Sequence, residues 1–184
     1  MTPPRMIRAV LGALVAFVVL LGFPLQAGAA SQQQAAQVVT YDASGAQEFV
    51  DAVNQGAQIW NESVKNVRFE PANGGQADLT VLADDGWPRA QPDGLGAGTI
   101  WMGRQAVNEG HDTLRIAAHE MGHILGLPDR RTGVCEELMS GHSAGTECKN
   151  PRPNAAEIAE VEQNFGQGVV LPRRMYLDTA PALR

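Results

Sequence analysis

Hydrophobic and polar positions follow two different periods along this chain. Four short runs rich in β-branched and aromatic residues predict strands. Three longer stretches place apolar residues three and four positions apart, which predicts helices. The turn-rich stretch from Asp84 to Gly96 is predicted to be a long loop. The predicted strands cover 38–41, 67–70, 78–82 and 98–102, and the predicted helices cover 46–63, 112–125 and 154–165.

Residues that favour helix starts stand before each predicted helix. Ser44 precedes the first helix and Asp112 the second, and each is predicted to cap its helix with a side-chain oxygen. Asn154 and Glu157 have the spacing of a capping box at the start of the third helix. Gly56 lies inside the first helix, where the missing side chain predicts close packing on a sheet.

Residues 1–30 have the layout of a secretory signal peptide. Arg5 and Arg8 form a positive start, an apolar run follows from Ala9 to about Leu25, and small residues close the segment. The alternative is a membrane anchor, but the run is short for a span, which needs about 20 apolar residues. We predict a signal peptide over 1–30, a short leader over 31–37, one folded domain over 38–166 and an irregular tail over 167–184.

The charge balance limits the partners of the protein. The chain has 14 basic and 20 acidic residues and a net charge of −6, which becomes −8 when Arg5 and Arg8 leave with the signal peptide. Because an acidic surface repels phosphates, we predict no nucleic-acid partner and no membrane partner after signal cleavage. The expected product is a secreted monomer.

Cys135 and Cys148 are the two cysteines of the chain. In an exported protein such a pair predicts one disulfide, which would stabilise the fold by about 3 kcal/mol in chain-entropy models. The alternative is a pair of buried thiols.

The segment from His119 to Asp129 reads HExxHxxGxxD and indicates a zinc site. His119 and His123 stand four residues apart on the predicted helix, so both imidazoles lie on one face. Gly126, just past the last helical turn, would let the chain double back so that Asp129 becomes the third ligand. Three protein ligands leave a fourth position open, which is typical of a catalytic zinc rather than a structural one.

Glu120 is the predicted catalytic residue. It lies one step round the turn from His119, so it reaches a zinc-bound water without binding the metal. Zinc would lower the pKa of this water and polarise the scissile carbonyl, while Glu120 acts as general base and returns the proton to the leaving amine. The alternative is a chance HExxH on an ordinary helix; Gly126, Asp129, the helix cap and the export signal disfavour it.

In this motif the chain resembles the snapalysin family, small secreted zinc endopeptidases of the metzincin group. The family has aspartate where most metzincins have a third histidine, as at Asp129, and its Met-turn would place Met139 beneath the zinc. Without the family, Met139 would be an ordinary core methionine. The similarity extends roughly from Val38 to Phe165 and includes Tyr41-Asp42, Ile59-Trp60-Asn61, Asn66-Val67, Glu137-Leu138-Met139-Ser140-Gly141, the Cys135–Cys148 spacing and Asn150-Pro151-x-Pro153-Asn154-Ala155.

The resemblance implies an α+β fold of the metzincin-like zincin type. This fold has a twisted mixed sheet with one antiparallel edge strand, an active-site helix beneath the sheet and a C-terminal helix. Residues 98–102 would be the edge strand, to which a substrate peptide adds as a further strand. The resemblance also implies protein or peptide substrates, one catalytic Zn²⁺ and a preference for an aromatic residue just after the cleaved bond.

Two positions depart from the family pattern. Arg131 stands where the family usually has a tyrosine that assists at the transition state. Its guanidinium would either stabilise the developing oxyanion or be a solvated charge. The family also binds Ca²⁺ near the start of the metal helix, but only Asp112 matches, since Leu114 has no side-chain oxygen. Calcium is therefore not favoured, and capping is the expected role of Asp112.

The predicted function is a secreted zinc-dependent metalloendopeptidase that hydrolyses extracellular proteins. The alternative is a secreted zinc-binding protein without protease activity, which the substitution at Arg131 suggests. A third reading is a membrane-anchored form. His111 and His142 fall in predicted loops and are interpreted as surface residues; the alternative is that either contacts substrate.

Overall fold

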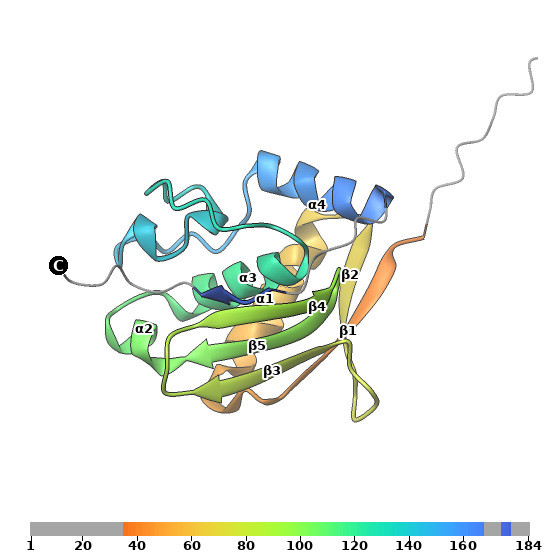
Figure 1. Cartoon of the computed structure of the whole chain (residues 1–184), viewed down its shortest axis with the longest axis horizontal. Helices are drawn as coiled ribbons and strands as arrows, with labels where there is room; N and C mark the ends of the chain where they lie inside the picture. Colours follow the sequence, from red (N-terminus) through yellow and green to blue (C-terminus); the bar gives the residue numbers. More distant parts are fainter. Residues whose placement is uncertain (1–34, 168–173, 178–184) are drawn as a thin grey trace, which may run out of the picture. The chain divides into compact units, whose positions relative to one another are not determined.

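The computed structural model describes residues 35–167 and 174–177 and contains a mixed six-stranded sheet in the order β2-β1-β3-β5-β4-β6 (Figure 1). Strands β2, β1, β3 and β5 run parallel, whereas β4 is antiparallel to β5 and β6 is antiparallel to β4. The predicted α+β class is confirmed. The strands are β1 (Gln37–Gly45), β2 (Val67–Pro71), β3 (Leu79–Asp84), β4 (Arg89–Gly94), β5 (Ala97–Gly103) and β6 (Tyr176–Leu177).

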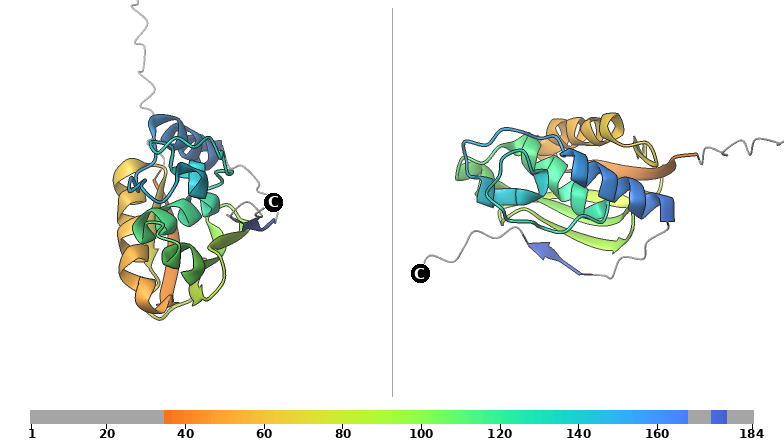
Figure 2. Two further views of the ribbon diagram at one scale, coloured as in Figure 1. Left: turned by 90° about the vertical axis from the view of Figure 1, so that its left-hand side faces the viewer. Right: turned by 90° about the horizontal axis from the view of Figure 1, so that it is seen from above.

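The longer helices cover one face of this sheet, as Figure 2 shows from two further sides. Trp60 is fully buried between them, and its indole Nε1 donates a hydrogen bond to Ala118 O over 2.9 Å. A Cβ at Gly56 would lie 3.3 Å from Ala118 N, so this glycine permits close packing against a helix rather than against the sheet as predicted. The helices are α1 (Val50–Ser63), α2 (Arg104–Asn108), α3 (Thr113–Ile124) and α4 (Ala155–Gln167), with 3₁₀ segments at Gln47–Phe49 and Leu138–Ala144.

The edge of the sheet differs from the prediction. The stretch 84–96 is not a long loop, because β4 forms within it and pairs antiparallel with β5. Residues 98–102 therefore belong to an inner strand, between β3 and β4, and β4 takes the place assigned to the edge strand. Only Ala90 and Pro92 point inward along β4, which leaves little hydrophobic alternation to detect, and proline disfavours a strand prediction.

The start of the first helix also differs. Ser44 lies inside β1 and does not cap α1; instead its backbone N–H donates to the Asp42 carboxylate over 2.8 Å. Gln47, with φ of 52°, turns the chain at the first residue of the 3₁₀ segment that leads into α1. The predicted cap at Ser44 is therefore wrong, because β1 continues past Ser44 to Gly45.

The other two caps are confirmed. Asp112 accepts a hydrogen bond from Arg115 N over 2.9 Å at the start of α3. At the start of α4, Asn154 N donates to the Glu157 carboxylate over 2.7 Å, and Glu157 N donates back to Asn154 Oδ1 over 3.0 Å. This reciprocal pair is a capping box.

Most of the two chain ends lies outside the described residues. The predicted signal peptide and most of the leader, 1–34, lie outside the described residues. In the tail expected to be irregular, Tyr176 and Leu177 form β6, while 168–173 and 178–184 lie outside the described residues. Within 35–167 and 174–177, no helix has the length and apolar character needed to cross a membrane.

Candidate metal centre and active site

Helix α3 presents His119 and His123 on one buried face, with ring centroids 4.7 Å apart. The Nδ1 atom of His119 lies 3.0 Å from Leu138 O, and Nδ1 of His123 lies 2.8 Å from Leu127 O. Because a carbonyl oxygen only accepts hydrogen bonds, each Nδ1 carries the proton. Each Nε2 therefore offers a lone pair, as a metal ligand must.

Gly126 turns the chain so that Asp129 returns to these histidines. Its φ of +95° is in the left-handed region that favours glycine, and Leu127 N closes the helix end by donating to Gly122 O over 3.0 Å. Asp129 Oδ1 consequently lies 3.3 Å from Nε2 of His119 and 3.6 Å from Nε2 of His123. The structure thus brings together the three residues that the motif predicted as ligands.

Protonation in this cluster suits a cation. Burial lowers the pKa of His123 below its ordinary value and keeps the imidazole neutral. Burial alone would raise the pKa of Asp129, but the adjacent imidazoles of His119 and His123 outweigh it and hold this pKa well below the usual range. Two neutral imidazoles and one carboxylate are the forms that bind metal.

These residues fit zinc. One ligand atom from each of His119, His123 and Asp129 lies within 4.8 Å of the others. Nε2 of His123 and Oδ1 of Asp129 are buried, and neither has a hydrogen bond of ordinary geometry to another atom of the described residues. Polar atoms left in this way are costly unless a further group binds them. Two nitrogens and one oxygen are a donor set that zinc prefers, with a fourth position open.

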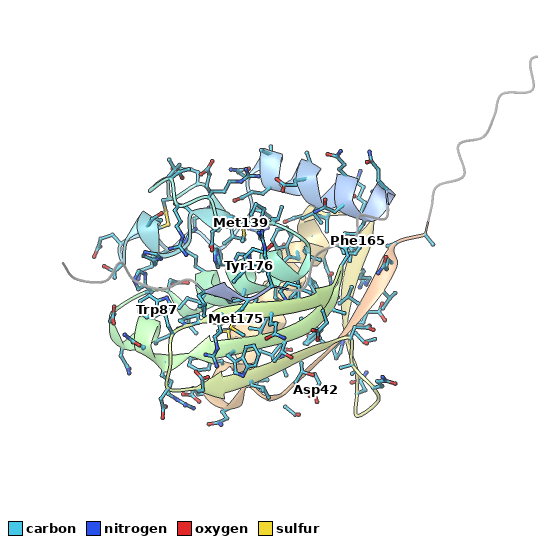
Figure 3. All side chains as sticks on the ribbon, in the orientation of Figure 1. Asp42, Trp87, Met139, Phe165, Met175 and Tyr176 are labelled. Atoms are coloured by element: carbon cyan, nitrogen blue, oxygen red, sulfur yellow. A yellow bond between two sulfur atoms is a disulfide. The ribbon has the colours of Figure 1, made fainter. Side chains whose placement is uncertain are left out.

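Glu120 and the predicted Met-turn flank the three ligands. Glu120 is fully buried and lines the same pocket as His119. Met139 is fully buried under α3, where a Cβ on Gly122 would lie 2.7 Å from its sulfur (Figure 3). Glycine at position 122 therefore lets α3 approach the segment around Met139 closely.

Glu157 has a second role that the capping box did not reveal. Its carboxylate also accepts hydrogen bonds from Leu138 N over 3.2 Å and Met139 N over 2.7 Å. Leu138 O is the atom that receives the Nδ1 proton of His119. The Glu157 carboxylate accepts several hydrogen bonds, so it both caps α4 and holds the backbone of Leu138. Through Leu138 O it helps to orient His119, a predicted metal ligand.

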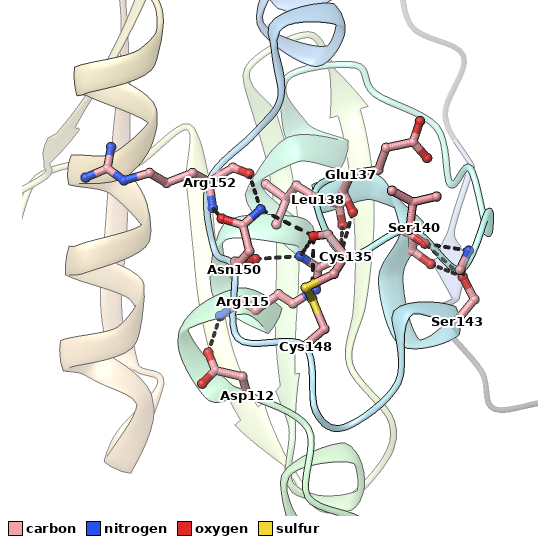
Figure 4. The surroundings of a disulfide bond; sticks show 12 residues. Asp112, Arg115, Cys135, Glu137, Leu138, Ser140, Ser143, Cys148, Asn150 and Arg152 are labelled. Carbon is pink, nitrogen blue, oxygen red and sulfur yellow. Dashed lines mark hydrogen bonds between the residues drawn. A yellow bond between two sulfur atoms is a disulfide. The ribbon is translucent and has the colours of Figure 1, made fainter.

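Arg115 organises the disulfide loop beneath the site, and its sequence position gave no sign of this (Figure 4). The predicted disulfide is confirmed, with Cα atoms of Cys135 and Cys148 5.5 Å apart. Arg115 is only 5% exposed, and its guanidinium donates to four backbone carbonyls. These belong to Cys135 at 3.1 Å, Glu137 at 2.7 Å, Leu138 at 3.3 Å and Asn150.

His111 and His142 are not plain surface residues, contrary to the prediction. Both are half-buried and lie edge-on to Trp87, with ring centroids 5.9 Å and 6.3 Å away. The three rings line the pocket that also contains His119 and Glu120. Their sequence neighbours are turn residues, so the packing on Trp87 comes from the tertiary fold.

Arg131 lies beside the cluster. Its guanidinium donates to Asp129 Oδ2 over 3.3 Å and lies 3.2 Å from Nδ1 of His142. Arg131 has φ of 51°, a left-handed conformation that is uncommon outside glycine. Its charge is thus paired with a predicted metal ligand rather than simply solvated.

Comparison with known proteins gives the family. The model of the Streptomyces extracellular neutral proteinase (M7) family matches residues 36–168. This chain belongs to that family. The extracellular small neutral protease of Streptomyces caespitosus is 45% identical over 132 residues, which cover 71% of this chain and 98% of that protein. Proteins of the same name from Streptomyces sp. (strain C5) and Streptomyces lividans are 44% and 42% identical over 73% of this chain each, and the matches span 58% and 59% of their length.

Membership of this protease family confirms the snapalysin resemblance, and the names of its relatives bear out the predicted export. The family match contains all four predicted site residues and ends at residue 168. Strand β6 lies beyond it, yet the ring of Tyr176 stacks on His123 with centroids 4.2 Å apart and planes 12° from parallel. No local pattern around Tyr176 predicted this contact.

Proposed function

We propose that this protein is a secreted zinc-dependent endopeptidase with residues 38–166 as its catalytic domain. One observation carries the proposal: the three potential ligand atoms converge beside a fully buried glutamate, Glu120. His119, His123 and Asp129 would hold the metal. The names of the relatives, extracellular small neutral proteases, support the same reaction class.

Each residue has a distinct task in the proposed reaction. A bound zinc supplies Lewis acidity, which acidifies water and polarises a carbonyl. Glu120 accepts the proton of the attacking water and passes it to the leaving amine. Leu138 O and Leu127 O hold the two imidazoles in one tautomer and one orientation. The buried surroundings of Glu120 strengthen its interactions with the reacting atoms.

Metal binding is the first test of this proposal. Purified protein is expected to bind one zinc per chain and to hydrolyse casein, and chelation is expected to stop hydrolysis until zinc is restored. Asp129→Asn should bind zinc more weakly, because the ligand loses its charge, whereas Asp51→Asn, at an exposed position of α1, serves as the matched control. Zinc at one per chain without hydrolysis of any peptide would favour the alternative, a zinc-binding protein without protease activity.

The pocket beside Glu120 supports a preference for an aromatic residue just after the cleaved bond. Trp87, His111 and His142 give this pocket a wall of ring systems, and rings of a substrate pack well against such edges. Trp87→Ala is expected to reduce kcat/KM about tenfold for a peptide with tyrosine at this position, and much less for one with alanine. A cleavage profile from a peptide library checks this, and equal losses for both peptides would contradict it.

A further inference from the structure

Strand β6 occupies the outer edge of β4. The two strands pair antiparallel, with Ala90 opposite Tyr176 and Arg89 opposite Leu177. The other edge of β4 pairs with β5, so β6 completes the hydrogen-bonding of a strand that would otherwise end the sheet on this side. Figure 3 shows Met175 and Tyr176 at this edge, in front of α3.

The same segment contacts the candidate metal centre. The phenol ring of Tyr176 covers the imidazole of His123, with centroids 4.2 Å apart. Leu177 O accepts a hydrogen bond from Arg131 over 2.8 Å, and the same guanidinium nitrogen also donates to Asp129. Tyr176 and Leu177 of one extended segment thus contact His123 and Arg131 at the candidate metal centre.

A substrate would need this position. If the protein is the endopeptidase proposed above, its substrate adds to the outer edge of β4 as an extended peptide and passes the proposed metal ligands. Each outward backbone group of β4 forms one strand pairing at a time. A substrate strand and β6 therefore exclude each other at Arg89 and Ala90.

We infer that residues 174–177 form an intramolecular competitor that occupies the substrate position of this protease. The segment is held by few contacts: its pairing with β4 covers two residues, and Met175 and Leu177 are 43% and 46% exposed. Segments with few buried contacts open at low free energy, so substrate displaces β6 rather than being blocked by it. The segment lies beyond the family match, which ends at residue 168.

Competition has a specific kinetic signature. Weakening β6 frees the edge of β4 for substrate but changes nothing at the reacting atoms, so KM falls while kcat stays the same. Tyr176→Ala removes the ring that stacks on His123 and is expected to lower KM about tenfold, the equivalent of about 1.4 kcal/mol. Tyr176→Phe keeps the ring and should behave as wild type. Met175→Ala alters a neighbouring exposed side chain and is the matched control.

The KM and kcat values of the Tyr176 variants distinguish competition by β6 from a direct role of Tyr176 in the reaction. Unchanged KM in Tyr176→Ala, with normal hydrolysis, would overturn the inference and leave the proposed function standing. A fall in kcat in both Tyr176→Phe and Tyr176→Ala would also overturn it, because the hydroxyl would then serve the reaction itself.

A second measurement does not depend on hydrolysis. Hydrogen exchange of the full-length Glu120→Gln protein should show faster exchange for the β4 segment 89–91 when Tyr176→Ala is added, and no change when Met175→Ala is added. An added inactive peptide with an extended apolar sequence should slow this exchange again. Equal exchange with and without Tyr176→Ala would contradict the inference. If no variant hydrolyses peptides, the proposed function fails, whereas the exchange result still decides whether β6 occupies the edge.

Discussion

Glu120→Gln is expected to lower kcat/KM for casein-derived peptides by roughly 10²–10⁴-fold, the usual contribution of a general base. Glutamine has nearly the same shape, and Glu120 is fully buried beside His119, so the fold should be preserved. The loss would come from the missing carboxylate, which can no longer accept the proton of the attacking water.

Two controls make this result specific. Zinc content should stay at one per chain in Glu120→Gln, because the proposed ligands are His119, His123 and Asp129. Glu109→Gln, an exposed change at the end of α2, should keep full activity. If Glu120→Gln bound zinc and cleaved peptides as fast as wild type, another residue would have to be the base.

Arg115→Met is expected to reduce the free energy of unfolding by about 3–5 kcal/mol. Arg115 is 5% exposed and its guanidinium donates to four carbonyls, so methionine would remove a charged donor from each of them. Leu138 O would keep only the hydrogen bond from His119, and Cys135 O the weaker one from Asn150. The loss should be measured by urea unfolding with the disulfide intact, since reduction of Cys135–Cys148 would add an effect of its own.

Further variants separate the geometry of Arg115 from its charge. Arg115→Lys keeps the charge but cannot reach four carbonyls with a planar fork, so it should be intermediate. Arg68→Met is the matched control, because the side chain of Arg68 is 61% exposed and its pairing with Glu70 contributes little. Equal stability of Arg115→Met and wild type would show that the carbonyls find other donors.

The site was predictable from the sequence because its main geometry is local. Residues four apart on a helix share a face, so the spacing of His119 and His123 was sufficient to place them together. Gly126 marked the point where the chain could reverse toward Asp129, and the structure has that turn. The caps at Asp112 and Asn154 were local for the same reason.

The misplaced elements depended on pairing between distant segments. Strand β4 has a weak hydrophobic alternation and contains Pro92, so only its partner β5 makes it a strand. Its presence moved the antiparallel side of the sheet beyond 98–102, so the proposed substrate position lies beside β4. Ser44 was assigned to a helix cap because nothing local revealed that β1 continues to Gly45.

By itself, the sequence determined the metal motif, the proposed base Glu120 and the disulfide partners, since residue spacing encodes them directly. The α+β class came from the resemblance to a known family. Only the tertiary structure decided what surrounds them. Arg115 donates to four carbonyls in and just after the disulfide loop, Glu157 accepts from the backbone of Leu138, whose carbonyl orients His119, and Tyr176 contacts His123 from beyond the family match. These contacts join residues that lie far apart in the chain. The type of each side chain alone does not tell which distant residue will lie next to it in the folded protein.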